Sequence, residues 1–135
     1  MATVTDFMSG IDPAKRDTPL VEVARQMRHG GVGALPVIDD DGQCIGIVTE
    51  RDIVVRVLAE DCDARATIAR DIATPNPITC DFDEQVPALI ALMRENEVQH
   101  LPVLENGRVV GMVSLADVVF SRPDEKRGVG VPFPP

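Results

Sequence analysis

An internal duplication constrains the fold of this chain more than any other feature. Residues 35–37, Leu-Pro-Val, recur 66 positions later as residues 101–103. Downstream of these triplets the offset becomes 65, and residues 46–52 match residues 111–117 at their glycine, valine and aspartate positions. The one-residue slip falls in a turn between the matched segments, where insertions are tolerated. The chain is therefore built from two copies of one small unit.

Each copy predicts the order helix, strand, strand, helix, after a short extended segment. Apolar residues recur at helical spacing over residues 20–27 and 86–93, and both stretches are followed by short apolar runs typical of strands. The four expected strands are residues 35–38, 44–48, 101–104 and 108–113. The pattern then returns to helical at Thr49 and Ser114. This alternation of helices and strands indicates an α/β fold.

Local signals mark the ends of these elements. Thr18-Pro19 predicts an N-cap followed by proline in the first helical turn. Asn106-Gly107 predicts a tight hairpin, because both residue types tolerate positive φ. The expected organisation is a first repeat, a partly helical connector, a second repeat and a Gly/Pro-rich tail, at residues 4–60, 61–69, 70–121 and 122–135.

The small size of each unit predicts that the two copies pack together. A unit of this length buries little apolar surface alone. We therefore expect the two sheets to face each other around a pseudo-twofold axis and to share one core. With aromatic residues at only 3%, that core must be aliphatic.

Charge and composition exclude several functions. The net charge of -9 argues against nucleic acid and anionic membranes, since both require a basic face. No apolar run approaches the roughly 20 residues needed to cross a bilayer, and the first residues do not resemble a signal peptide. The three cysteines form no CxxC pair and indicate a reduced, cytoplasmic protein without a metal site.

The repeated segments resemble a known family. Residues 46–52 (Gly-Ile-Val-Thr-Glu-Arg-Asp) and 111–117 (Gly-Met-Val-Ser-Leu-Ala-Asp) are similar to the signature of CBS domains, and the Leu-Pro-Val strands lie at the family's distance upstream. The resemblance covers roughly residues 4 to 121. It implies a Bateman module that dimerises and binds AMP, ADP, ATP or S-adenosylmethionine in clefts between the copies. Such a module requires no cofactor and regulates an attached or separate protein.

The residues themselves suggest a chemistry for these clefts. Thr49 and Ser114 each open a helix, where free N–H groups and the helix dipole suit a phosphate. The carboxylates of Asp52 and Asp117, three residues further on, can accept both hydroxyl protons of a ribose. Four apolar strand residues are expected to sandwich an adenine ring: Val37, Ile47, Val103 and Met112.

The same spacing has a purely structural interpretation. Thr-x-x-Asp and Ser-x-x-Asp also match a capping box, in which side chain and backbone close the start of a helix. The duplication does not decide between the two, because both copies would inherit a cap. Both roles can coexist, with the hydroxyl capping the helix and the carboxylate facing a ligand.

The two clefts are not expected to be equivalent. Arg51 stands beside Asp52, and the second copy has instead His100 before its Leu-Pro-Val strand. The resemblance implies that a threonine in the extended segment of one copy faces the Asp of the other. Thr79 fits this pattern and pairs with Asp52, whereas the matching residue of the first copy is Pro13. The Asp52 site is therefore the expected working site, and the acidic net charge favours AMP or S-adenosylmethionine over ATP.

Other functions remain open at this point. The chain has no nucleophile elbow, P-loop or dinucleotide fingerprint, so we expect no catalysis. The acidic run at residues 39–42 lacks the ligand spread of a calcium loop and predicts a turn. A ligand-free dimer that serves as a protein-interaction or stress-response module is the main alternative. Self-association is expected through apolar helix faces: Val54, Val57, Leu58, Val118 and Val119.

Overall fold

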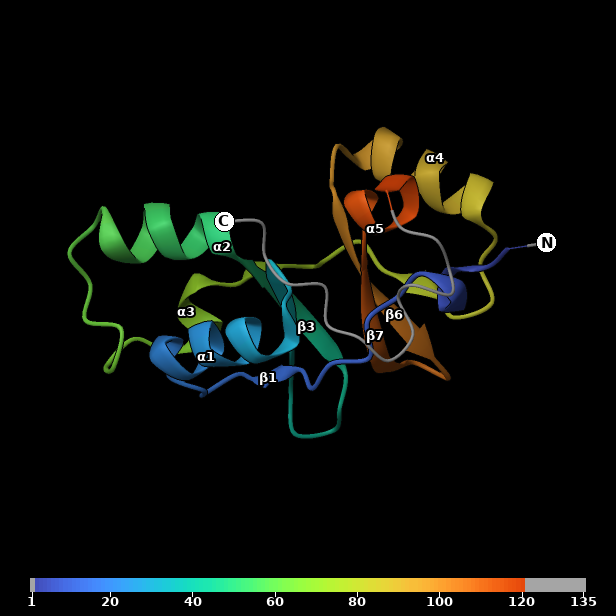
Figure 1. Cartoon of the computed structure of the whole chain (residues 1–135). Coiled ribbons are helices and arrows are strands. Elements are labelled where there is room, and N and C mark those ends of the chain that lie inside the picture. Colours follow the sequence, from blue (N-terminus) through green and yellow to red (C-terminus); the bar gives the residue numbers. More distant parts are fainter. Residues whose placement is uncertain (1, 121–135) are drawn as a thin grey trace.

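The computed structural model describes residues 2–120, in which two small sheets lie side by side and each carries helices on its outer face (Figure 1). The elements of the first half are η1 (Val4–Asp6), β1 (Ala14–Lys15), α1 (Leu20–Gly30), β2 (Ala34–Ile38), β3 (Cys44–Thr49), α2 (Glu50–Asp52) and the π-helix η2 (Ile53–Leu58). Those of the second half are α3 (Ala69–Ile72), β4 (Thr74–Pro75), β5 (Cys80–Asp81), α4 (Val86–Asn96), β6 (His100–Glu105), β7 (Arg108–Ser114) and α5 (Leu115–Phe120). The expected duplicated α/β fold is confirmed.

Both sheets are built on the same antiparallel pair. The first sheet has the order β1-β2-β3-β4 and the second the order β5-β6-β7. In each, a two-residue strand runs parallel to the Leu-Pro-Val strand, which pairs antiparallel with the strand carrying the glycine motif. The second hairpin turns at Asn106 and Gly107, with φ of 53° and 79°, as the sequence predicts.

Extended segments are exchanged between the two halves. β4, which precedes the second copy, pairs with β3 of the first copy, with Thr74 opposite Ile47. In the other direction, Ser9 forms an antiparallel bridge with Met112 of β7, through N–H to carbonyl bonds of 2.8 and 3.0 Å. The two copies are thus connected by backbone pairing at both sheet edges.

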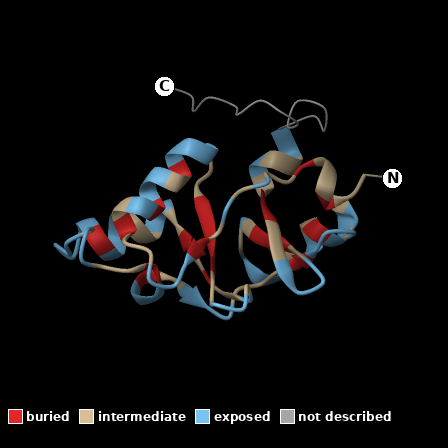
Figure 2. Ribbon diagram, turned by 90° about the horizontal axis from the view of Figure 1, so that it is seen from below, coloured by how far each residue is buried: buried red, intermediate tan, exposed pale blue. Residues whose placement is uncertain are grey.

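Two apolar clusters form the interior, instead of the single shared core that the sequence suggested. The first contains Leu20, Leu35 and Val48 beneath the helices of the first sheet, and the second contains Leu89, Leu101 and Val113. Figure 2 shows them as two groups of buried residues. They are separate because the face of each sheet that carries these apolar side chains is covered by the helices of its own half. η1 packs into the second cluster and α3 into the first, so the exchange of segments extends to the cores.

Two local expectations were wrong. Thr18 does not cap α1: the N-cap residue is Pro19, and the Thr18 hydroxyl accepts a hydrogen bond from the Lys15 N–H at 3.0 Å. The expected connector, residues 61–69, contains turns and an isolated bridge between Ile68 and Pro19, and helix begins only at its last residue, Ala69. Asp63 organises these turns, because its carbonyl accepts the N–H groups of residues 66 and 67.

Candidate functional site

Both repeated Thr/Ser-x-x-Asp motifs form capping boxes. The Asp52 carboxylate accepts from the Thr49 N–H at 2.9 Å, and the Asp52 N–H donates to the Thr49 hydroxyl at 3.2 Å. The same reciprocal pair joins Ser114 and Asp117, with both bonds at 3.0 Å. The capping interpretation is therefore confirmed in both copies. One carboxylate oxygen suffices for the cap, so the second oxygen of Asp52 can serve a ligand.

A cleft of about 570 Å³ opens beside Asp52. We call it the Asp52 cleft, and it lies where the N-terminus of α2 meets β4 and the loop before β6. This volume is in the range of small-molecule sites. Its lining residues come from both copies: Gly33, Ile47, Thr49, Glu50, Arg51, Asp52, Thr74, Glu97, Val98, Gln99 and His100.

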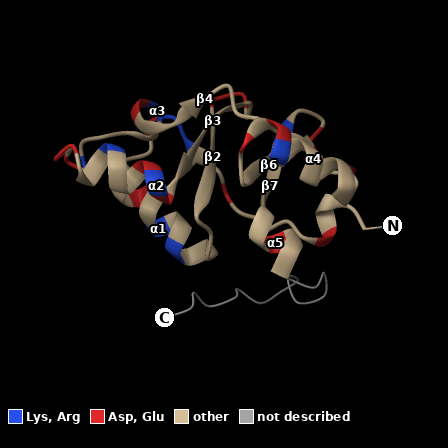
Figure 3. Ribbon diagram, turned by 90° about the horizontal axis from the view of Figure 1, so that it is seen from above, with Lys and Arg blue, Asp and Glu red and all other residues tan. Residues whose placement is uncertain are grey.

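The charges lining the Asp52 cleft are mainly acidic. Three carboxylates, from Glu50, Asp52 and Glu97, face one guanidinium, that of Arg51, and the imidazole of His100. Acidic and basic residues are adjacent along α2 in Figure 3. One arginine can contact a single phosphate, whereas several phosphates would meet uncompensated carboxylates. The cleft therefore suits a ligand of low negative charge.

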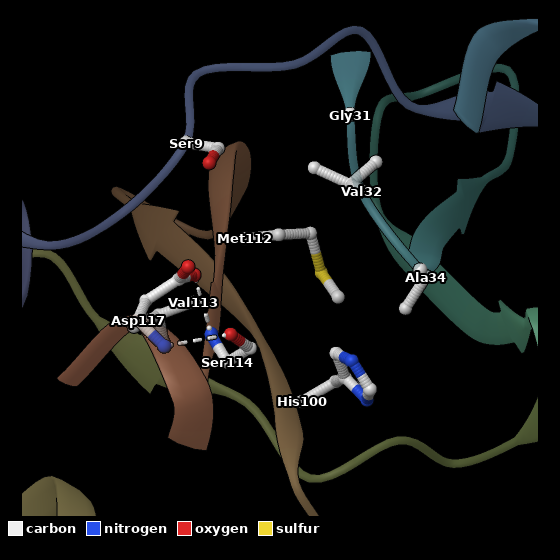
Figure 4. Close-up of a pocket in the computed structure, with 10 residues that line it drawn as sticks. Ser9, Gly31, Val32, Ala34, His100, Met112, Val113, Ser114 and Asp117 are labelled. Atoms are coloured by element: carbon white, nitrogen blue, oxygen red, sulfur yellow. Dashed lines mark hydrogen bonds between the residues drawn. The ribbon is translucent and has the colours of Figure 1, made fainter. Parts of the chain in front are cut away.

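The equivalent space beside Asp117 is much smaller, about 80 Å³. We call it the Asp117 cleft, and it is lined by Ser9, Gly31, Val32, Gly33, Ala34, His100, Met112, Val113, Ser114 and Asp117. Figure 4 shows the Met112 thioether and the His100 ring pointing into the space between Ser114 and Ala34. Room for a few water molecules remains, which is far below the roughly 300 Å³ of the smallest usual ligand sites.

Two of the four residues that we expected to contact an adenine ring line these clefts. Ile47 lines the Asp52 cleft and Met112 the Asp117 cleft. Val37 and Val103 were wrong, because both are fully buried in the two core clusters. Side chains alternate along a strand, so Val37 shares the helix-covered face with Leu35, whereas the intervening Pro36 has the opposite face.

Thr79 was also wrong as a residue of the Asp52 cleft. It lines neither cleft and directly precedes β5, which pairs with β6 of its own copy. The extended segment does cross to the other copy, but it does so earlier, at Thr74. Likewise Ser9 and not Pro13 reaches the Asp117 cleft.

The remaining predicted residues lie at the clefts as expected. Thr49, Arg51 and Asp52 meet in one cleft, and Ser114 and Asp117 in the other. His100, predicted beside Asp117, lines both clefts. The sequence analysis missed the loops before β2 and β6, which contribute Gly33, Glu97, Val98 and Gln99. Positive φ at Gly31 and Glu97 turns these loops toward the clefts. Glycine favours this conformation and can be recognised in the sequence, whereas a glutamate does not predict it.

Burial lowers the pKa of His100 from its ordinary value of 6.5, and the nearby Asp117 and Glu50 carboxylates oppose this shift. The unfolded chain therefore binds a proton on this residue more readily than the folded chain does. By linkage, this contribution to stability is complete above about pH 6.5 and is lost as the pH falls below it.

We expect His100→Gln to flatten the acid side of the stability profile. Thermal unfolding midpoints measured between about pH 7.5 and 5.5 should fall less steeply in this variant than in the wild type. His29→Gln, at an exposed histidine of α1, is the matched control and should retain the wild-type slope. Parallel profiles for wild type and His100→Gln would contradict the expectation.

The cysteines and the acidic residues of the described chain form no candidate metal site. Residues 2–120 contain no group of three or more His, Cys, Asp or Glu side chains arranged to hold a metal ion. All three cysteines are free, and burial raises the pKa of the Cys80 thiol to about 12, which keeps it protonated and unreactive. No helix in this range is long and apolar enough to cross a membrane.

Comparison with known proteins identifies relatives of this arrangement. The sequence model of the CBS domain matches the chain twice, over residues 4–59 and 69–123. Hypoxic response protein 1 of Mycobacterium tuberculosis is 31% identical over 125 residues, which are 92% of this chain and 87% of that protein. Protein MK0525 of Methanopyrus kandleri is 34% identical over 104 residues, but this chain spans only 53% of its length.

Solved structures share the two-sheet architecture. Hypoxic response protein I with two coordinated zinc ions superposes with a TM-score of 0.76 at 30% identity, covering 87% of this chain and 96% of that one. The CBS domain pair of protein MJ0100, in complex with 5′-methylthioadenosine and S-adenosyl-L-methionine, gives a TM-score of 0.72 at 28% identity, covering 87% and 93%. The second of these structures contains ligands with an adenosine group.

Proposed function

The chain belongs to the CBS-domain family, and on this basis we propose that it is a regulatory module that binds an adenosine-containing ligand in the Asp52 cleft. Binding would change the contacts of the module with a second copy or a partner protein. The observation that carries the proposal is the open cleft of about 570 Å³ beside the capped Asp52. This volume is within the range of known small-molecule sites.

The lining of the Asp52 cleft supplies each contact that an adenosine ligand requires. In this proposal the second carboxylate oxygen of Asp52 accepts hydrogen bonds from the ribose hydroxyls, and Ile47 and Val98, which line the cleft, contact the base. Arg51 and the Thr49 hydroxyl are available for a phosphate. These groups come from both copies, so a bound ligand would connect them.

The charge balance favours AMP among the nucleotides. Three carboxylates line the cleft beside a single arginine, so each phosphate after the first would be unpaired. The net charge of -9 adds a long-range penalty for ADP and ATP. S-adenosylmethionine, which is cationic, is the alternative ligand, and it is one of the two compounds in the structure of the MJ0100 domain pair.

A ligand-free interaction module is the competing proposal. It predicts that both clefts are filled by the protein's own side chains. The Asp117 cleft meets this description and the Asp52 cleft does not. We therefore favour a ligand-binding module, with no catalytic role, in a reducing compartment such as the cytoplasm, where the three free cysteines would persist.

We propose that the signal is transmitted through exposed helices. The apolar side chains of Val54, Leu58, Val119 and Phe120 are more than half exposed, whereas the expected Val57 is buried in the first core. Exposed apolar side chains that form a continuous patch are typical of association surfaces. A sedimentation equilibrium mass of about twice 14.6 kDa would support a homodimer, and a monomer at high micromolar concentration would contradict it.

Thermal unfolding in the presence of ligands tests the proposed function directly. We expect AMP or S-adenosylmethionine at 100 times its dissociation constant to stabilise the folded chain by about 2.7 kcal/mol. For a chain of this size the midpoint should rise by roughly 8 to 16 °C. ADP, ATP and NAD are compared at the same concentration. No shift with any of the five would favour the ligand-free module.

A further inference from the structure

The side chain of His100 lies between the two clefts. His100 and Gly33 are the two residues that line both the Asp52 cleft and the Asp117 cleft in the described chain. Gly33 has no side chain, so the imidazole of His100 is the only side-chain group that the two spaces share. The negative charges of Glu50 and Asp117, one in each cleft, both favour the protonated form of this imidazole.

One position of the duplicated unit carries side chains of very different size in the two copies. Ala34 pairs with the cap residue Thr49, and His100 pairs with the cap residue Ser114. Ala34 and His100 therefore occupy the same place in the two copies. The methyl group of Ala34 does not reach the Asp52 cleft, whereas the larger ring of His100 enters the Asp117 cleft next to its own Ser114.

Met112 also fills the Asp117 cleft, but it is the more adaptable of the two side chains. It matches Ile47 of the first copy, since each is paired with the proline of a Leu-Pro-Val strand. Methionine has three rotatable side-chain bonds and repacks easily around a ligand. The imidazole is rigid and is held at the start of β6, so it is the stronger obstacle.

We propose that His100 limits this chain to one adenosine-type ligand, because its ring occupies the space that a second ligand would need beside Asp117. The inference rests on the proposed function. According to this inference, His100 determines how many ligands bind. The capping box at Asp117 then has only a structural role, whereas the one at Asp52 also contributes to a binding site. Because His100 lines both clefts, removing its ring should join the space beside Asp117 to the larger cleft. With repacking of Met112, a second ligand should then fit beside Ser114 and Asp117.

Isothermal titration of the full chain with AMP, and separately with S-adenosylmethionine, tests this proposal. The wild type should bind one molecule of whichever compound binds. His100→Ala should bind two, and the added site should disappear in His100→Ala combined with Asp117→Asn. His29→Ala, the same change at the exposed histidine of α1, should still bind one.

The other outcomes distinguish failure of this inference from failure of the proposed function. Two molecules bound per wild-type chain, or a single site in a folded His100→Ala chain, would overturn the inference and leave the proposed function standing. Absence of binding of both compounds to the wild type would overturn the proposed function itself. If His100→Ala does not unfold cooperatively in the absence of ligand, His100→Ser provides an equally small side chain that can hydrogen-bond at the strand end, and the same counts apply to it.

Discussion

Asp52→Asn should reduce the affinity for AMP or S-adenosylmethionine by roughly 10- to 100-fold. Asparagine keeps one oxygen, which can still accept the Thr49 N–H that Asp52 accepts at 2.9 Å. It loses the negative charge and the second acceptor, which a ribose needs for two hydroxyl contacts. Hydrogen bonds to a charged group contribute about 1.5 to 3 kcal/mol, which corresponds to this loss. Isothermal titration at constant salt measures it.

Asp117→Asn is the matched control for this experiment. It makes the same change in the same capping box, where the Ser114 N–H donates to the carboxylate at 3.0 Å. Its cleft of about 80 Å³ cannot hold an adenosine, so the affinity should stay within about twofold of wild type. Both variants should lose a similar, small amount of stability, at most about 1 kcal/mol, from a weakened cap. Equal losses of affinity in the two variants would show that the clefts are equivalent and contradict the assignment.

The fold could be predicted from the sequence because the duplication provides two independent observations of each element. Both copies show the same strand, turn and helix signals, and the structure confirms them at both places. The capping boxes were predictable for the same reason, since Thr49 and Ser114 each precede an aspartate by three residues. Such local signals depend on residues that are close in the sequence.

The composition of the clefts depended on information that a single sequence does not contain. Val37 and Val103 were assigned to the wrong face because a short apolar strand does not reveal which side meets the other sheet. Thr79 was chosen in place of Thr74 because the point at which the segment crosses to β3 is set by tertiary pairing. The unequal size of the clefts depends on residues far apart in the sequence, such as Ala34 and His100, which line the same small space.

A second large effect, on stability, is expected at Gly46 and Gly111. At each of these glycines a segment exchanged from the other copy approaches the strand closely. A Cβ atom added to Gly111 would lie 2.7 Å from the Ser9 carbonyl oxygen and 3.1 Å from the Met8 sulfur. A Cβ atom added to Gly46 would lie 2.9 Å from the Ala73 Cβ and 3.0 Å from the Thr74 carbonyl oxygen. Contacts this short force the crossing segment to move, because its backbone cannot be compressed.

We therefore expect both Gly111→Ala and Gly46→Ala to lower the free energy of unfolding by about 1 to 3 kcal/mol, the usual cost of overpacking. The midpoint of thermal unfolding should fall by roughly 3 to 6 °C for each kcal/mol. Gly10→Ala is the matched control, since no atom lies within 4 Å of its added Cβ, and it should stay within about 0.5 kcal/mol of wild type. A loss at Gly10 equal to that at Gly111 would show that steric crowding is not the cause.

The affinity for AMP should differ between the two glycine variants, because the segments that they displace line different clefts. Gly46→Ala moves the segment that carries Thr74 into the lining of the Asp52 cleft, so it should weaken AMP binding several-fold as well as destabilise the fold. Gly111→Ala moves Ser9, which borders only the Asp117 cleft, and should destabilise the fold while AMP affinity remains near wild type. A decrease in affinity in Gly111→Ala but not in Gly46→Ala would place the ligand in the Asp117 cleft and reverse the ranking of the two sites.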